Sequence, residues 1–387
     1  MMGHWLRRIG LALTVLVLLA AALALWQRER LIRLMAVNTL FSADRIVSNF
    51  SHMDELFLTA PLPRGDGAVS PLPAGPALDL PPEVDTWIDR RAITALVILK
   101  DGALVHESYH LGTGPDDLRI SWSMAKSFLS ALTGTLVAEG AVDLSHPVTH
   151  YFPALAGSAY DGATVEDVLQ MESGLAFDED YLDFWSDINR MGRVLALGRS
   201  MDDFAAGQDQ RRVEPGTDWE YVSIDTHVLG MVLRGATGDS ATALMAERII
   251  APLGLERTPH YVTDGSGTAF VLGGLNLTAR DYARFGQMIA QGGHWQGRQV
   301  VPADWIEAST TASALTGPDE LGYGYQWWIP RDARPGEVFG RGIYGQYLWI
   351  DRARNVVIVV TAADRAFRDP GVNAANIDML RRIAAGL

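Results

Sequence analysis

Alternation of apolar and polar residues predicts strands, then helices, then strands along most of this chain. Ile93–Lys100 and Ala103–Tyr109 are β-rich runs, and the Asp101-Gly102 between them suits a tight hairpin turn. From Trp122 to Glu139 the apolar residues recur at helical spacing. Residues 143–315 combine helical patterns with Gly and Pro. The first half of the chain therefore predicts a hairpin followed by a helix-rich region.

The C-terminal part returns to strand-forming patterns. Tyr323–Ile329, Tyr344–Ile350 and Val356–Thr361 are β-rich, and a last helix is predicted around Asn373–Ala385. A sheet built from both sides of a helical insertion at roughly 143–315 is an α/β plan with two lobes. The boundary between two lobes is a natural place for a cleft.

The N-terminal residues differ from the rest of the chain. Ile9–Trp26 is a run of 18 residues without a charge, and as a helix it would be about 27 Å long, close to the thickness of a bilayer core. We expect residues 1–26 to be an uncleaved transmembrane anchor, because the apolar run continues past the cleavage-like Ala22-Leu23-Ala24. A cleaved signal peptide is the alternative. Arginines flank both ends and leave the orientation open, but we expect a membrane-anchored protein whose body is exported, to the periplasm or another extracytoplasmic space.

Residues 27–82 predict a stalk and a linker. Residues 27 to about 58 have an amphipathic helical pattern, with Leu31, Leu34 and Met35 among polar residues. Pro61–Pro82 then holds seven of the 18 prolines, which favours an extended linker or wrapping arm. The main domain is expected to occupy residues 83–387.

Composition narrows the classes of function. The net charge of −14 argues against a nucleic-acid-binding protein, which normally has a basic face. The chain has no cysteine, so disulfides, Cys-ligated metals and thiol nucleophiles are excluded. No other metal-ligand spacing is present, and we expect neither a metal nor a cofactor.

Lysine is rare in this chain, which makes Lys126 informative. Lys100 and Lys126 are the only lysines among 32 basic residues, and Lys126 follows Ser123 by three positions. Residues i and i+3 of a helix share a face. A serine hydroxyl needs a proton acceptor to become a nucleophile, and a buried lysine can serve where an arginine, with a pKa above 12, cannot. An ordinary exposed helix lysine is the plainer explanation of a short S-x-x-K match.

Further motifs accompany this pair. Tyr221-Val-Ser223 stands about 100 residues after Ser123-Met-Ala-Lys126. Together these motifs resemble the serine β-lactamase and penicillin-recognising superfamily, in its class C-like branch, over roughly residues 84–387. The family's third motif, K-T-G, has no counterpart, since no lysine follows Lys126; Gly-Ile343-Tyr-Gly-Gln346 stands in its place. That form, with Asp178-Glu-Asp-Tyr181, is most similar to 6-aminohexanoate-dimer hydrolases and related carboxylesterases.

The resemblance implies a β-lactamase-like fold, an antiparallel sheet flanked by helices with an inserted helical lobe. It also implies acyl transfer through an acyl-enzyme on Ser123. Lys126 and Tyr221 would share the serine proton, and Tyr221 would protonate the leaving group. Which of the two is the base stays open, because coupled groups titrate as a unit.

The resemblance also implies residues that bind the substrate. The backbone N–H of Ser123 and an N–H near Ile343 would hold the developing oxyanion, with Gln346 as an alternative to Ile343. Tyr181 has the spacing of a tyrosine that binds the substrate amide. Ser223 would orient Lys126 or the substrate.

Three functions are compatible with these residues. We favour a serine hydrolase that cleaves a small-molecule ester or short amide. A β-lactamase or D,D-peptidase is the first alternative, weakened because the missing K-T-G lysine would hold the substrate carboxylate. A non-catalytic receptor is the second, and the intact Ser, Lys and Tyr argue against it. The sequence specifies neither the natural substrate nor the oligomeric state.

Overall fold

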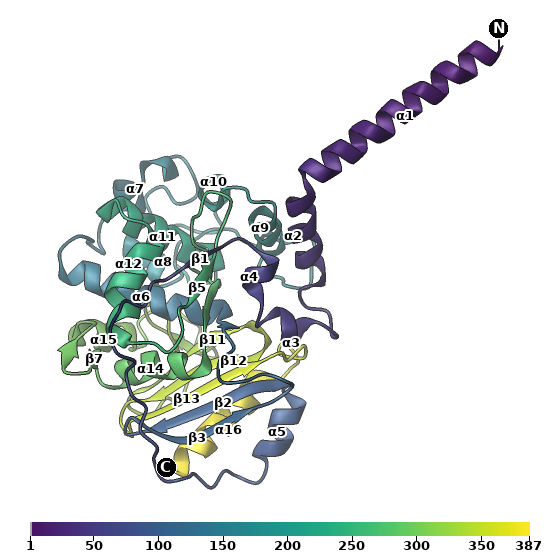
Figure 1. Ribbon diagram of the computed structural model, residues 1–387. Coiled ribbons are helices and arrows are strands. Elements are labelled where there is room, and N and C mark those ends of the chain that lie inside the picture. Colours follow the sequence, from purple (N-terminus) through teal and green to yellow (C-terminus); the bar gives the residue numbers. More distant parts are fainter. Residues whose placement is uncertain (1) are drawn as a thin grey trace.

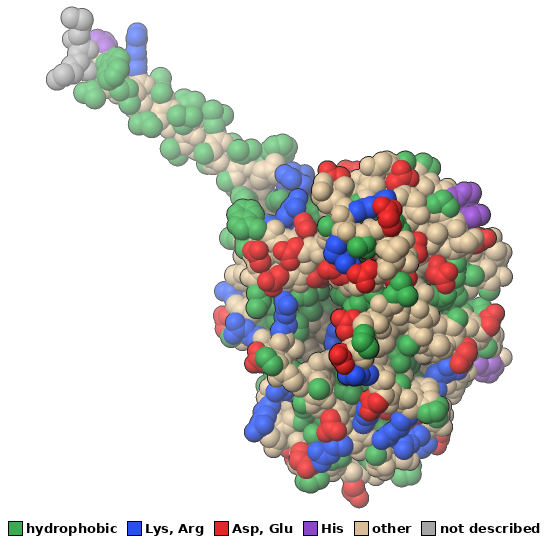
Figure 2. Space-filling model, turned by 180° about the vertical axis from the view of Figure 1, so that it is seen from behind, with side chains coloured by type: hydrophobic (Ala, Val, Ile, Leu, Met, Phe, Trp, Pro, Cys, Tyr) green, Lys and Arg blue, Asp and Glu red, His purple; other side chains and the backbone are tan. Residues whose placement is uncertain are grey.

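The computed structural model describes residues 2–387 and consists of a projecting helix and a body (Figure 1). The helix is α1 (Met2–Trp26), and its segment His4–Trp26 has a mean hydropathy of 2.6 and no buried residue. Its length and composition suit a membrane span, and a signal sequence meets the same description. Hydrophobic side chains cover α1, whereas acidic and basic side chains are mixed over the body (Figure 2).

An antiparallel sheet of seven strands forms the lower part of the body, in the order β3-β2-β13-β12-β11-β10-β9. Its strands are β2 (Ile93–Lys100), β3 (Ala103–Tyr109), β9 (Gly322–Tyr323), β10 (Trp328–Ile329), β11 (Glu337–Gly342), β12 (Gln346–Asp351) and β13 (Val356–Ala362). The predicted hairpin is confirmed, with positive φ at both Asp101 and Gly102. Because β2 pairs with β13, distant parts of the chain complete one sheet, as predicted.

Helices cover both faces of this sheet. On one face lie α5 (Val84–Arg90) and α16 (Val372–Ala385), and on the other α6 (Ala125–Ala138) and α14 (Ala279–Ala290). Alternate residues of β13 therefore enter two different cores, and Val356–Ala362 is buried throughout. Burial on both faces explains why this strand reads as an unbroken apolar run. The predicted antiparallel sheet flanked by helices is confirmed.

The inserted region is mainly helical but also contains strands. Its helices are α7 (Val148–Tyr151), α8 (Val165–Leu169), α9 (Asp187–Ala196), α10 (Met201–Ala206), α11 (Ser223–Thr237), α12 (Ala241–Met245), α13 (Ala251–Leu253) and α15 (Ala303–Ser309). A four-stranded sheet, in the order β1-β5-β6-β4, joins this region to the N-terminal segment. It consists of β1 (Thr59–Pro61), β4 (Arg119–Ile120), β5 (His260–Val262) and β6 (Leu275–Leu277), and the hairpin β7 (His294–Trp295) with β8 (Arg298–Gln299) stands apart.

The segment predicted as a stalk is instead part of the body. It forms α2 (Arg28–Thr39), α3 (Ile46–Asn49) and α4 (Met53–Leu56), which lie against the body (Figure 1). Phe50 is fully buried, and Thr59–Pro61 pairs with His260–Val262. The amphipathic pattern correctly indicated an apolar face, but it could not show that the body covers that face.

The proline-rich segment runs along the edge of the large sheet. Gly75 N–H donates to the Leu104 carbonyl, and Leu104 N–H donates to Pro73. Prolines lack the donor that a central strand needs, so this segment suits a sheet edge. It acts as a wrapping arm at this point.

We predict that truncations separate the roles of α1 and the N-terminal segment. Removing residues 1–26 should change the free energy of unfolding by less than about 0.5 kcal/mol, because α1 buries nothing. Removing residues 1–62 should prevent folding, because deleting a buried Phe side chain alone costs about 3–5 kcal/mol of a total of about 5–15. Circular dichroism melts of both truncations test this. A cooperative melt of the shorter chain would show that the segment is a detachable stalk.

Candidate active site

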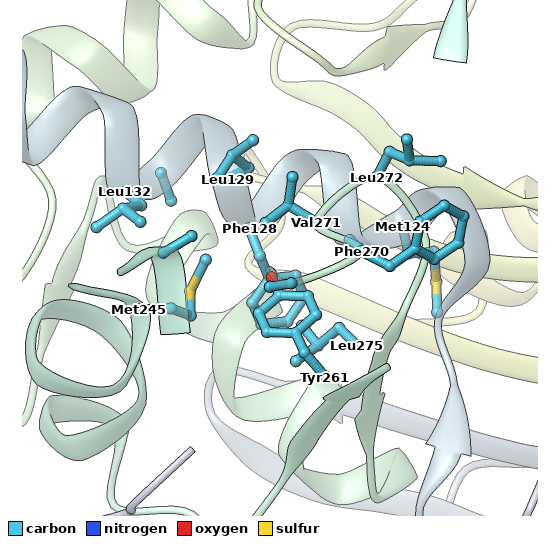
Figure 3. Packing of buried hydrophobic residues seen from close by; sticks show 14 of the residues in the cluster. Met124, Phe128, Leu129, Leu132, Met245, Tyr261, Phe270, Val271, Leu272 and Leu275 are labelled. Carbon is cyan, nitrogen blue, oxygen red and sulfur yellow. The ribbon is translucent and has the colours of Figure 1, made fainter. Parts of the chain in front are cut away.

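The helix that carries Ser123 and Lys126 is fixed in the core. A 3₁₀ turn, η1 (Trp122–Met124), leads directly into α6. The apolar side of α6 packs against the β5–β6 region and Phe270 (Figure 3), and its Phe128 and Leu129 are fully buried, as is Met124 of η1. This packing leaves α6 little freedom to shift, so Ser123 and Lys126 are held at one place.

Lys126 is buried beside Ser123. Its Nζ lies 3.2 Å from Ser123 Oγ and 3.4 Å from Ser223 Oγ, and it donates to the Leu272 carbonyl at 3.0 Å. Burial lowers the pKa of Lys126 to about 7, although the negative charges of Glu179 and Asp225 act in the opposite direction. A large fraction of this amine is therefore neutral near pH 7 and able to accept a proton.

Tyr221 reaches the same place from the loop that precedes α11. The Lys126 Nζ lies 5.3 Å from the centre of the Tyr221 ring, and this ring stacks on Trp328 at 5.2 Å. Burial and then Glu179 raise the pKa of Tyr221, while the nearby Ser123 and Ser223 hydroxyls lower it. The phenol is thus protonated at neutral pH and close to both serines.

Two carboxyl groups near Lys126, those of the half-buried Glu179 and the buried Asp225, were not predicted from the sequence. Glu179 accepts a hydrogen bond from the Ser223 N–H, and within residues 2–387 its Oε2 has no partner. Burial raises the pKa of Glu179 while the Lys126 charge lowers it. Asp225, on α11, accepts hydrogen bonds from Tyr160 and Ser173 at 2.7 and 2.9 Å, and burial raises its pKa to about 8.

The only sequence signal for Glu179 was its position in the Asp178–Tyr181 segment. Three consecutive acidic residues, Asp178–Asp180, look like an exposed loop, and the pattern does not show which one turns inward. Asp225 lies within an otherwise apolar helix, where a single carboxylate does not reveal its partners.

The end of β11 comes unusually close to the turn that carries Ser123. A Cβ at Gly342 would lie 2.5 Å from the Ser121 carbonyl oxygen, and one at Gly340 would lie 3.2 Å from Ser127 Oγ. Glycine at these positions allows the close approach. It brings Ile343, the first residue of the turn η4 (Ile343–Gly345), to the same cavity as Ser123. In the described chain, neither the Ser123 nor the Ile343 N–H takes part in a loop, turn or cap hydrogen bond.

Aromatic residues of the N-terminal segment support both of these backbone turns. Trp122 (φ 44°) and Tyr344 (φ 60°) adopt left-handed conformations that are unfavourable for bulky side chains. The Phe41 ring stacks on the Tyr344 ring with 4.6 Å between the ring centres. The Trp122 ring centre lies 5.6 Å from that of Phe41 and 5.4 Å from that of Phe50. The N-terminal segment thus packs directly on the residues next to Ser123 and Ile343.

The remaining predicted residues occupy different positions. Tyr181 lines the cavity at Ser123, and burial together with the nearby Glu179 raises its pKa. Ser223 lies between Lys126 and Glu179. The buried Gln346 side chain donates from its amide nitrogen to the carbonyls of Ala362, Ile343 and Tyr344. Its amide oxygen accepts a hydrogen bond from the Ala362 N–H. The Gln346 side chain therefore holds η4 in place, and an oxyanion role for the Gln346 backbone N–H stays a prediction.

The cavity at Ser123 has a volume of about 290 Å³. It extends from Ser123 toward α2, α9 and the residues after Tyr181, and most of its lining side chains are apolar. Lys126 and Tyr221 do not line it. The cluster of Ser123, Lys126 and Tyr221 therefore stands at one side of a largely apolar space.

The fold and the Ser-Lys-Tyr cluster define a serine hydrolase of the β-lactamase type. The family model for β-lactamase matches residues 84–379, and the chain belongs to this family. It is 33% identical to the 6-aminohexanoate-dimer hydrolase of Paenarthrobacter ureafaciens over 330 residues, which is 80% of this chain and 83% of that protein. It is also 29% identical to esterase EstB of Burkholderia gladioli over 150 residues, 34% of this chain and 36% of that protein.

Solved structures show the same fold. A Bacillus anthracis protein assigned as a 6-aminohexanoate-dimer hydrolase superposes with a TM-score of 0.80 at 24% identity, covering 89% of this chain and 95% of that chain. The predicted superfamily and its branch are confirmed, and the protein is a hydrolase of the serine β-lactamase family.

Gly342→Ala should disable the oxyanion site while leaving the protein folded. The added Cβ would push β11 away from the Ser121 carbonyl and move the Ile343 N–H, and loss of one oxyanion donor lowers kcat by about 10²–10³-fold. Steady-state kinetics on p-nitrophenyl butyrate measures the loss. Gly67→Ala, where an added Cβ meets nothing within 4 Å, is the control. Wild-type kcat in a folded Gly342→Ala protein would refute the assignment of Ile343.

On the expectation that neutral Lys126 is the base, we predict that kcat/KM rises with pH through a limb near 7. Glu179→Gln removes a negative charge that raises the Lys126 pKa, so the limb should move to lower pH by about one unit or more. The exposed neighbour Asp180, changed to Asn, should leave the limb in place. Profiles of kcat/KM against pH for the wild type, Glu179→Gln and Asp180→Asn test this prediction. A Glu179→Gln profile whose limb stays at the wild-type pH or moves to higher pH would contradict it.

Proposed function

We propose that the protein hydrolyses an ester or short amide through an acyl-enzyme on Ser123. The observation that carries this proposal is the 3.2 Å distance between Ser123 Oγ and a fully buried Lys126 Nζ whose pKa is lowered to about 7. Such an amine can take the hydroxyl proton at neutral pH. The hydrolase and esterase names of the relatives support the reaction class.

In the first half of the reaction, Ser123 Oγ gives its proton to Lys126 and attacks the carbonyl carbon. The carbonyl oxygen becomes an oxyanion held by the N–H groups of Ser123 and Ile343. Tyr221 then donates its proton to the leaving oxygen or nitrogen as the bond to the acyl carbon breaks, and takes a proton back from Lys126. Water attacks the acyl-enzyme by the same route in reverse.

Electrostatics favour Lys126 as the base over Tyr221. Burial makes the charged form of each group less favourable, which lowers the pKa of the amine toward 7 but raises that of the phenol. At neutral pH the amine is partly free to accept a proton, whereas the phenol carries one to donate. The same environment thus gives the two groups different roles. Ser223 and Tyr181 are proposed to orient Lys126 and the substrate.

β-Lactamase or D,D-peptidase activity is less well supported. Those substrates carry a carboxylate beside the scissile bond, and no lysine follows Lys126 to bind it. On β11, which leads to Ile343, the cation is Arg341, whose guanidinium lies 4.2 Å over the Trp328 ring. An ester or amide without that carboxylate fits the site better.

We propose further that α1 anchors the protein in a membrane and that the body is exported. The support is the length, apolar composition and complete exposure of α1. Cleavage at Ala22-Leu23-Ala24 is the alternative, and N-terminal sequencing of the membrane fraction distinguishes them. The residues from Arg28 onward belong to the body in either case.

Replacing Lys126 with Arg tests the mechanism. This change keeps a positive charge but removes the ability to accept a proton, so turnover should fall by about 10²–10⁴-fold. The substrates are p-nitrophenyl butyrate, a linear amide, a β-lactam and a D-Ala-D-Ala peptide. The Ser123→Ala variant, which cannot form the acyl-enzyme, measures the background turnover. Thermal melts check that both variants are folded. An active Lys126→Arg protein would show that another group is the base.

A further inference from the structure

The substrate cavity has an apolar lining that the proposed mechanism does not use. The N-terminal segment contributes Val37, Leu40 and Phe41, and α9 contributes Ile188, Met191 and Leu195. Its volume of about 290 Å³ is near the lower end of the range for ligand pockets, about 300–1,000 Å³. It therefore has room for a narrow, apolar group.

Charge is almost absent from this lining. Among the described residues that line the cavity, the only charged one is Arg193. Its guanidinium packs over the Phe184 ring at 4.1 Å and donates to the Phe184 carbonyl. A substrate group carrying an ammonium would lose its hydration here without gaining an opposite charge, and a carboxylate would find only the Arg193 guanidinium, which already packs on Phe184.

The geometry of the reaction determines which part of the substrate enters the cavity. The oxyanion donors Ser123 and Ile343 line it, whereas Tyr221 lies on the other side, against Tyr323 and Trp328. The leaving group must lie next to the acid that protonates it. The acyl chain therefore points away from Tyr221 and into the cavity.

The mouth of the cavity is apolar and close to α1. Leu182 and Phe184 line the cavity yet are 80% and 51% exposed, so they stand at its entrance. Val37 and Asn38 of α2 form part of the wall, and α2 follows α1 after a bend at Gln27 (Figure 1). Eleven residues of helix place Val37 about 17 Å from the end of α1. An entrance at that distance from a membrane span can receive a chain from the bilayer surface.

On these grounds we infer that the substrate is an ester or amide with a linear apolar acyl chain, drawn from the membrane to which α1 attaches the body. This inference rests on the proposed function and specifies its substrate class. The chain lies along the wall formed by α2 and α9. Each methylene that enters the cavity should raise kcat/KM about fourfold (about 0.8 kcal/mol) until the cavity is full.

Gly192 offers a way to fill the cavity without disturbing the fold. It lines the cavity from α9, and a Cβ there meets nothing within 4 Å. Leucine is a better helix former than glycine, so Gly192→Leu should not destabilise α9. The matched control is Gly114→Leu, at another glycine whose added Cβ meets nothing within 4 Å and which does not line the cavity.

The first experiment measures kcat/KM for p-nitrophenyl acetate, butyrate, octanoate and dodecanoate with the full chain in detergent. We expect the wild type and Gly114→Leu to prefer octanoate over acetate by at least tenfold. Gly192→Leu should lose that preference, because its kcat/KM for octanoate should fall at least tenfold more than its kcat/KM for acetate. Acetate turnover with no gain from chain length, or an equal loss on every ester by Gly192→Leu, would overturn the acyl-chain assignment and leave the proposed function standing. No turnover of any of these esters or of a linear amide would instead refute the proposed function.

A second experiment tests the membrane as the source of the chain. The full-length protein is reconstituted in phosphatidylcholine vesicles, and p-nitrophenyl dodecanoate is placed either in the same vesicles or in separate ones. We expect at least tenfold faster hydrolysis in the shared vesicles, and equal rates for p-nitrophenyl acetate, which is soluble. Equal rates for the dodecanoate would show that the long-chain substrate reaches the site from solution.

Discussion

The desolvation of one amine is the constraint on which the rest of the site depends. An ammonium ion loses much of its hydration when it is fully buried, and this loss lowers its pKa. At Lys126 the Leu272 carbonyl and two serine hydroxyls replace part of that hydration, and Glu179 and Asp225 offset part of the cost. The balance leaves the pKa at about 7. A less polar environment would lower the pKa of Lys126 further and make the amine a weaker base. A more solvated environment would raise this pKa and keep the amine protonated.

The same burial shifts the pKa values of Lys126 and of the acidic groups around it in opposite directions. It raises the pKa of Tyr221 and of both carboxyl groups while it lowers that of the amine. Burial raises the pKa of Asp225 to about 8, so its charge supports the amine less than its position suggests. Glu179 faces both Lys126 and the start of α11 through Ser223. It is therefore the carboxyl group best placed to adjust the pKa of Lys126.

The N-terminal segment connects α1 to the backbone at the reaction site. Left-handed conformations at residues such as Trp122 and Tyr344 cost of order 1–3 kcal/mol each and persist only when their surroundings fix them. Phe41 and Phe50 supply that fixing by packing on both side chains. Because Phe41 follows α2 closely, α2, the cavity wall and the backbone at Ser123 and Ile343 are parts of one continuous stretch of packing. A flexible stalk would have left these functions independent.

Local patterns predicted much of the fold, and motifs predicted the central residues of the site. The hairpin at Asp101-Gly102 and the helix carrying Lys126 are determined by short-range turn chemistry and periodicity, which a sequence displays. Strand β11 was missed, because Gly340 and Gly342, which permit its approach to Ser121, weaken the strand pattern. Packing of the N-terminal segment was missed for a different reason: an amphipathic pattern reveals an apolar face but not what covers it. Tyr221 was reached only through the family resemblance, since nothing local relates it to Ser123.

The positive charges near the site explain how the missing K-T-G lysine and the apolar cavity are related. Arg193, Arg341 and Arg368 lie around the site, and each guanidinium packs over an aromatic ring, those of Phe184, Trp328 and Tyr181 respectively. A guanidinium held in this way is attracted to the ring and shielded on that face. Lys126, the remaining cation of the cluster, must be neutral to act. A site arranged like this gives an anionic substrate little to bind near the scissile bond. Under the proposed function, the loss of the family's carboxylate-binding lysine and the apolar lining beyond Ser123 are then two aspects of one preference, for an uncharged acyl group.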